Sequence, residues 1–265
     1  KIDSKAFKSS NLAGISLPAS VEEIGSEAFM SSRIESITMP SNMPLAGIGE
    51  KVFAKSHLRN IILPNNITEI GKNAFSSCPN LKEIILNNGL LKIGENAFAP
   101  IEPENHFDII ETISIPDTVT EIGEKAFEKC AVTEVHFGAD LQTIGNSAFI
   151  GCNNLSKVSF SGNQLTSIGN SAFSVCSSLD EISLPGSVSK IGNEAFSKSG
   201  LFAFTVPQST SDIGYGILYN CTNLDRIAVA DGNPNFTILG DALYEIKNAV
   251  PYRAIAYPIK KAADS

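Results

Sequence analysis

Hydrophobic residues along the chain follow a short unit that changes period halfway and then begins again. In the complete unit at residues 179–196, Ile182 and Leu184 alternate with polar residues, and period-two alternation predicts a short strand with one buried face. The second half ends in Ile191, Gly, two variable residues, Ala and Phe196. Its wider apolar spacing favours one turn of helix or 3₁₀ structure, which a very short second strand in the stretch from Val188 to Ile191 could precede.

The hexapeptide Ile-Gly-x-x-Ala-Phe marks every unit. Ten copies, of which seven are intact and three weaker, begin at Ile2, Ile24, Ile48, Ile70, Ile93, Ile122, Ile144, Ile168, Ile191 and Ile213. Successive copies start 22, 24, 22, 23, 29, 22, 24, 23 and 22 residues apart, a period that indicates a leucine-rich solenoid. We therefore expect one elongated domain in which each unit forms one coil and packs against its neighbours.

The alternating half of each unit directs two apolar side chains into the expected core. These pairs are Ile15/Leu17, Ile37/Met39, Ile61/Leu63, Ile84/Leu86, Ile113/Ile115, Val135/Phe137, Val158/Phe160, Ile182/Leu184, Phe204/Val206 and Ile227/Val229. Stacked coils would join these segments into a parallel sheet along one side of the solenoid. In the hexapeptide we expect the glycine to permit a sharp change of chain direction, and the alanine to allow close approach of backbones.

Composition narrows the range of partners. The hydrophobic fraction of 43% supplies a core, and no apolar run approaches the roughly 18 residues needed to span a bilayer. The net charge of −8 opposes a nucleic acid partner, which requires clustered Lys and Arg. The chain begins at Lys1 without a leader segment, and no strand precedes its first hexapeptide, so we expect further residues upstream.

The five cysteines all occupy one position of the unit, three residues after the hexapeptide: Cys78, Cys130, Cys152, Cys176 and Cys221. Equivalent side chains along a rod point in parallel, so they neither converge on a metal ion nor suit disulfide geometry. A bridge from Cys152 to Cys130 or to Cys176 stays open as an alternative. No histidine recurs nearby, which disfavours a catalytic thiol, and we predict buried reduced thiols.

The full unit, Leu-x-x-Ile-x-Leu-Pro-x-x-Val-x-x-Ile-Gly-x-x-Ala-Phe-x-x-Cys, resembles the BspA-like leucine-rich repeats, also called the Treponema pallidum type, from Ile2 to about Leu243. The resemblance implies a curved right-handed repeat solenoid with a concave parallel β-sheet, and with short helical or 3₁₀ turns and short strands on the other side. It also implies a secreted or cell-surface bacterial protein, since characterised relatives are adhesins. It supplies no catalytic residue, so we expect no enzyme activity and no cofactor.

Two departures from the repeat suggest how the chain is divided. Residues 1–230 are expected to form a solenoid of about ten units of 22–24 residues, with an insertion at residues 99–108. Residues 231–265 resemble variant repeats of the family that carry an Asn-Pro-x-aromatic signature, although the order of Gly240 and Asp241 is reversed. We interpret this stretch as a variant terminal repeat or C-terminal cap.

Candidate binding residues stand at exposed strand positions of the concave face and in the insertion. They are Ile62, Glu83, Ile85, Glu134, His136, Lys157 and Glu181 on the face, and Glu102, Glu104 and His106 in the insertion. Ile62 and Ile85 would form a small apolar patch on adjacent strands, either a protein contact or ordinary surface. Glu134 and His136 have the chemistry of an acid and base pair, but no nucleophile accompanies them, which favours a plain surface pair. The insertion has cation-binding groups, and a solvated loop is the favoured interpretation.

Three functional hypotheses remain on this sequence. The leading one is a non-catalytic extracellular module that binds a protein, such as a host matrix protein or another bacterial surface protein, through the concave face and the insertion. The alternative is a structural spacer or stalk that presents another domain at the cell surface. A hydrolytic enzyme would need a converging polar pocket. Exposed strand positions lack aromatic residues, which disfavours a sugar ligand.

Overall fold

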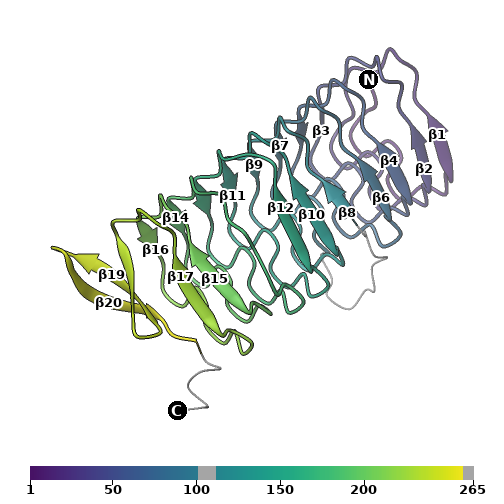
Figure 1. Ribbon diagram of the computed structural model, residues 1–265. Coiled ribbons are helices and arrows are strands. Elements are labelled where there is room, and N and C mark those ends of the chain that lie inside the picture. Colours follow the sequence, from purple (N-terminus) through teal and green to yellow (C-terminus); the bar gives the residue numbers. More distant parts are fainter. Residues whose placement is uncertain (101–111, 259–265) are drawn as a thin grey trace.

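A computed structural model describes residues 1–100 and 112–258, and in it the repeats stack into an elongated parallel solenoid (Figure 1). Most coils contribute a longer strand on one side and a two-residue strand on another. The longer strands are β1 (Gly14–Ser16), β2 (Ser36–Thr38), β4 (Asn60–Ile62), β6 (Glu83–Ile85), β8 (Thr112–Ser114), β10 (Glu134–Phe137), β12 (Lys157–Phe160), β15 (Ala203–Val206) and β17 (Arg226–Val229). We call their exposed side, which the sequence predicted to be concave, the long-strand face.

The two-residue strands run through the first residue of the last eight hexapeptides, whereas Ile2 and Ile24 of the first two form an isolated bridge. These strands are β3 (Gly47–Ile48), β5 (Glu69–Ile70), β7 (Lys92–Ile93), β9 (Glu121–Ile122), β11 (Thr143–Ile144), β13 (Ser167–Ile168), β14 (Lys190–Ile191) and β16 (Asp212–Ile213). All eight pair in sequence order as one parallel sheet, in which each isoleucine faces the isoleucine of the next coil. The very short second strand predicted from the sequence is confirmed.

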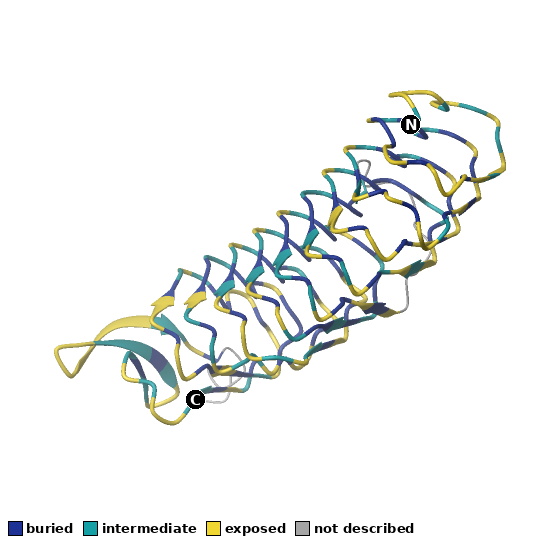
Figure 2. Cartoon of the chain, turned by 90° about the horizontal axis from the view of Figure 1, so that it is seen from above, coloured by how far each residue is buried: buried dark blue, intermediate teal, exposed yellow. Residues whose placement is uncertain are grey.

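An antiparallel sheet follows the last parallel strand. It consists of β18 (Phe236–Leu239), β19 (Ala242–Lys247) and β20 (Val250–Ala256), paired in that order. Figure 1 shows it at the C-terminal end of the stack, and Figure 2 shows that much of it is exposed, whereas buried stretches recur from coil to coil along the solenoid. Arg253 on β20 donates to the Ile213 carbonyl of β16 at 3.1 Å, which ties this sheet to the last short strand.

The core is a set of columns in which one repeat position stacks on itself. Hexapeptide phenylalanines from Phe7 to Phe196 form eight successive parallel ring pairs, with centroids 5.0–5.6 Å apart. The alanines and isoleucines of the intact copies are buried beside them, as are most of the predicted inward strand residues. Removing this apolar surface from water at every coil is the main favourable term for the fold.

The predicted helical or 3₁₀ turn is wrong, because the described residues contain no helix. After the short strand, alternate N–H groups donate to the neighbouring coil: Ser147 to Asn170 and Phe149 to Ala172, at 2.7 and 2.8 Å. The residues between them close tight turns within the coil instead, as Ala148 does to the Gly145 carbonyl at 3.3 Å. A helix would need every N–H to bond inside its own segment.

Left-handed backbone conformations enforce this alternation. The fourth hexapeptide residue has a positive φ in all ten copies, at Lys5, Glu27, Lys51, Asn73, Asn96, Lys125, Ser147, Ser171, Glu194 and Gly216. A second such residue follows two positions after the last hexapeptide residue in nine of them, including Val175 and Asn220. A left-handed residue breaks a right-handed helix. The apolar spacing of the hexapeptide is compatible with a helical turn, but in this structure it belongs to a series of tight turns.

The hexapeptide glycine serves close packing of coils, which differs from the role that the sequence suggested. Gly145 has no positive φ, and a Cβ built on it would lie 2.7 Å from the carbonyl carbon of Gly123 in the preceding coil. Real Cβ atoms do not approach a backbone so closely, so only glycine lets the coils reach hydrogen-bonding distance here.

The longer strands pair in four groups, β1-β2, β4-β6, β8-β10-β12 and β15-β17, and the last break falls where the sequence predicted another strand. Residues 181–184, which include the inward pair Ile182 and Leu184, are not a strand, and neither β12 nor β15 pairs across them. Within the described residues, the main-chain groups of these four residues make no hydrogen bond. The adjacent Asp180 carbonyl still accepts from the Phe202 N–H at 2.9 Å. The coil therefore stays in the stack, but residues 181–184 make none of the main-chain hydrogen bonds of a strand to any other described residue. We call these residues the opened strand.

The cysteines are all buried and free, as predicted. Each thiol donates to a phenylalanine carbonyl of the preceding coil, at Sγ–O distances of 3.0–3.4 Å. Burial raises the pKa of Cys130 and of Cys176 to about 12. Serine takes the same column position at Ser56 and Ser199, where its hydroxyl lies beside the next thiol. The column therefore accepts a small hydrogen-bonding side chain.

The left-handed position of Val175 (φ 61°) carries strain, because a β-branched side chain crowds this conformation. Replacing Val175 with Asn, the residue that occupies the equivalent Asn220, should raise the free energy of unfolding by about 0.5–1 kcal/mol. The reverse exchange, Asn220→Val, should lower it by a similar amount. Urea unfolding followed by circular dichroism measures both, and a loss of stability in Val175→Asn would contradict this explanation of the turns.

Raised thiol pKa values predict that the cysteines are inert in the folded chain. At pH 8, a thiol with a pKa of about 12 is ionised in only about one molecule in 10⁴, and the thiolate is the reactive form. Iodoacetamide should therefore leave all five cysteines unmodified by mass spectrometry in buffer, and modify all five in guanidinium chloride. Labelling of any cysteine within minutes in buffer would show that its coil opens or that its thiol is exposed.

Candidate binding surface

The long-strand face presents one or two side chains of each coil to solvent, between residues directed into the core. Strands β2, β4 and β8 each bury their central residue and expose both flanking ones. The pairing register aligns these exposed residues in rows across the sheet. Among the predicted residues, Glu134 aligns with Lys157, and Glu83 aligns with Asn60. Glu181 lies on the same side of the coil but outside any strand.

Ile62 and Ile85 are direct register partners on β4 and β6. Their side chains are 63% and 46% exposed, respectively. The structure thus confirms that they are neighbours and accessible, as the sequence predicted. Two adjacent β-branched side chains on a rigid sheet form an apolar contact area with little conformational entropy to lose on binding.

A polar network connects β10 and β12 across the face. The Nδ1 atom of His136 lies 2.6 Å from the Ser159 hydroxyl, and its Nε2 atom lies 3.4 Å from a Glu134 carboxylate oxygen. Lys157 approaches the same carboxylate oxygen at 3.5 Å. The sequence paired Glu134 with His136 but missed Ser159, because that residue belongs to the next coil and only the strand register brings it close.

This Ser–His–Glu succession lacks the enclosed surroundings that activate a nucleophile. The side chains of His136 and Glu134 are 35% and 37% exposed, whereas a nucleophile is activated in a site that excludes water and offers hydrogen-bond donors to the developing oxyanion. Lys157 also competes for the carboxylate that would orient the imidazole. The network therefore holds His136 in one orientation at the surface, as a fixed polar contact.

Two depressions lie on either side of the opened strand at residues 181–184. One, of about 480 Å³, includes Glu134 and Lys157 in its wall. The other, of about 440 Å³, includes Phe202 and Arg226. Both are also lined by Asp180, Glu181 and Ser183. The sequence analysis named Glu181 as a candidate but not Asp180 or Phe202. The repeat pattern gives no indication that residues 181–184 fail to form a strand.

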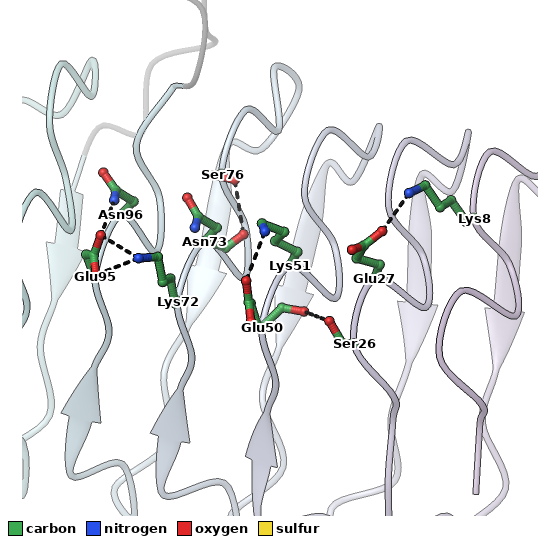
Figure 3. Close-up of polar contacts among 10 residues, drawn as sticks. All are labelled: Lys8, Ser26, Glu27, Glu50, Lys51, Lys72, Asn73, Ser76, Glu95 and Asn96. Atoms are coloured by element: carbon green, nitrogen blue, oxygen red, sulfur yellow. Dashed lines mark hydrogen bonds and ion pairs between the residues drawn. The ribbon is translucent and has the colours of Figure 1, made fainter.

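The turns opposite the strands carry charges that are mostly satisfied within the solenoid. Figure 3 shows Lys8 with Glu27, Lys51 with Glu50, and Lys72 with Glu95 on successive coils. Exposed pairs of this kind contribute little to stability individually, but each pair leaves less unpaired charge for a ligand at its own turn. The turn surface is therefore a weaker candidate than the long-strand face.

A third depression, of about 410 Å³, lies beside β3 near the N-terminus and is lined by Glu22, Glu23, Glu50 and Glu69 among others. Glu23 pairs with Lys1 and Glu50 with Lys51. In the part of the chain that the structure describes, no three His, Cys, Asp or Glu side chains are placed to hold a metal ion. This acidic hollow therefore gives no evidence of a cation site.

Glu102, Glu104 and His106 of the predicted insertion lie outside the described residues. Among residues 1–100 and 112–258, no helix has the length and apolar character required to cross a membrane.

Comparison with solved structures finds bacterial proteins that resemble this solenoid. A leucine-rich cell surface protein of Faecalibacterium prausnitzii is 26% identical, with a TM-score of 0.58 over 94% of this chain and 55% of its own. The pneumococcal vaccine antigen PcpA is 21% identical, with a TM-score of 0.51 over 85% of this chain and 64% of its own, and so shows a common fold. A Treponema pallidum leucine-rich repeat protein is 30% identical over 44% of this chain and 57% of its own, with a TM-score of 0.42.

The chain thus spans between 55% and 64% of the length of these three structures. No curated protein matches it. The model of a family described as BspA type leucine-rich repeat region, in six copies, matches residues 1–107 and 104–225, which agrees with the repeated hexapeptide and with the stacked coils. The chain belongs to the BspA-type leucine-rich repeat family.

Proposed function

We propose that this chain is an extracellular adhesion module that binds another protein through the long-strand face. The observation that carries the proposal is the chemistry of that face: an exposed apolar pair, a fixed polar network and two depressions lie on one rigid surface. A protein interface needs such a mixture of apolar contact and oriented polar groups. The turn surface offers mainly charges that pair with one another.

The family supports this proposal at a coarser level. Leucine-rich repeats generally mediate protein interactions, and their solenoids are typically non-catalytic scaffolds. The relative from Faecalibacterium prausnitzii is described as a cell surface protein. A location on the cell surface and a partner such as a host matrix protein or another bacterial surface protein are therefore part of the proposal for this chain.

A structural spacer is the second candidate, and the uniformity of the stack favours it. Eight short strands form one uninterrupted sheet from β3 to β16, so the solenoid has the continuity of a stalk. A spacer would need no particular side chain at exposed strand positions. The two functions are separated by whether exposed residues of the long-strand face matter.

The proposal predicts that charge at the apolar pair weakens binding without unfolding the chain. The double variant Ile62→Asp/Ile85→Asp should lose at least about tenfold in affinity for a partner, since two carboxylates must then be desolvated at the contact. Leu91→Asp/Tyr219→Asp is a matched control, because these side chains are 49% and 64% exposed and lie outside the long-strand face. Surface plasmon resonance against purified host matrix proteins and bacterial surface proteins measures the affinities.

Two results would contradict the adhesion proposal. One is no binding to any protein of the panel at about 100 μM, which corresponds to less than about 5.5 kcal/mol of binding free energy. The other is binding that neither Ile62→Asp/Ile85→Asp nor any other substitution of exposed residues on the long-strand face weakens. Either outcome would favour the spacer.

A further inference from the structure

The opened strand at residues 181–184 creates two free strand edges inside the long-strand face. On one side β12 pairs only with β10, and on the other β15 pairs only with β17. Between them, main-chain N–H and C=O groups of residues 181–184 bond to no other described residue. Unpaired strand edges are the surfaces at which proteins most readily add an extended segment of another chain.

The two depressions beside this segment form one groove across the sheet. They share Asp180, Glu181 and Ser183, which are exposed, and the groove continues to Lys157 on one side and to Arg226 on the other. Ile182 is buried beneath the same stretch, with 7% exposure. The core below the opening is therefore intact, and the groove lies in the surface layer. We call it the sheet-gap groove.

Negatively charged side chains outnumber positively charged ones in the sheet-gap groove. Lys157 is already held near Glu134. Asp180 and Glu181 form no ion pair with any described residue, and neither does Arg226. Two carboxylates and one guanidinium without an ion-pair partner leave the groove with an excess of negative charge beside the unpaired main-chain groups. The overall charge of −8 adds long-range attraction for cationic partners.

We infer that the sheet-gap groove takes an extended peptide segment that carries a lysine or an arginine. The cationic side chain would pair with Asp180 and Glu181, and the segment's main chain would bond to the groups that the opened strand leaves free. Phe202, which is 47% exposed in the wall, offers a ring face to the aliphatic part of that side chain. This inference rests on the proposed function and names the chemistry of its partner.

Other ligand classes fit the groove less well. A polyanion such as nucleic acid would meet the two free carboxylates. A bare metal ion would require three converging ligands, and the described residues offer no such group. A peptide is favoured because it alone combines the cation with a main chain of donors and acceptors at strand spacing.

The test is selection of a displayed library of random twelve-residue peptides on the full chain, followed by synthesis of the enriched peptides. Fluorescence anisotropy then compares the parent chain with Asp180→Asn/Glu181→Gln. The matched control is Glu22→Gln/Glu69→Gln, which removes the same charge from exposed residues outside the groove. Thermal melting checks that both variants remain folded.

The expected result is enrichment of peptides that contain Lys or Arg, with at least a tenfold loss of affinity for Asp180→Asn/Glu181→Gln and less than a twofold loss for the control. The inference is overturned if nothing is enriched, if enriched peptides lack a cation, or if both variants lose affinity equally, since the last result would mean non-specific attraction. If peptides bind but respond only to Ile62→Asp/Ile85→Asp, the groove assignment fails while the adhesion proposal stands. Indifference to both long-strand variants contradicts both.

Discussion

Hydrogen bonding between coils is the constraint on which the rest of this structure depends. A coil of 22–24 residues contains no regular helix to satisfy its main chain, and a buried unpaired amide costs about 1–3 kcal/mol. The described coils meet this demand by directing alternate N–H groups to the next coil and closing tight turns with those between. The glycine, the left-handed residues and the phenylalanine column each serve this arrangement.

The same constraint leaves little room for function inside the solenoid. The Ile, Gly, Ala and Phe of the hexapeptide serve packing and its fourth residue serves backbone geometry, so function is left to exposed turn positions, exposed strand positions and places where the ladder is open. Residues 181–184 are the clearest such place on the long-strand face, because the flanking coils keep their spacing while one strand gives up its bonds. Partner recognition at such a site would not require any change in the core.

Much of the fold could be predicted from the sequence, because stacking amplifies a weak local pattern. Most inward residues, the short strand at eight of the ten hexapeptide isoleucines and the pairing of Ile62 with Ile85 follow from repeat phase alone. The helical turn could not be rejected in this way, since alternating tight turns and a helical turn give similar apolar spacing. Positive φ at residues such as Ser147 and Ser171 has no compositional signature, because lysine, glutamate, asparagine and serine all occupy it.

The candidate site was less predictable for a related reason. The position of Glu181 in the repeat predicts that it lies in a strand, as its equivalents in other coils do. Only the three-dimensional structure shows that residues 181–184 lack, within the described chain, the main-chain hydrogen bonds of a strand. The contact of Ser159 with His136 was not predicted, because the two residues are 23 positions apart in the sequence and only the pairing of their strands brings them together. In both cases the deciding information is the relation between coils, which no single repeat contains.

Amide hydrogen exchange of the native chain, resolved by residue, tests this account most directly. The N–H groups that bond to the next coil, such as those of Ser147, Phe149 and Gly151, should exchange only through global opening. Those of Glu181, Ser183 and Leu184 should exchange at least about 100-fold faster, because they lack protein partners. Equal protection at both sets of residues would contradict an open strand, and rapid exchange at the first set would contradict the inter-coil ladder itself.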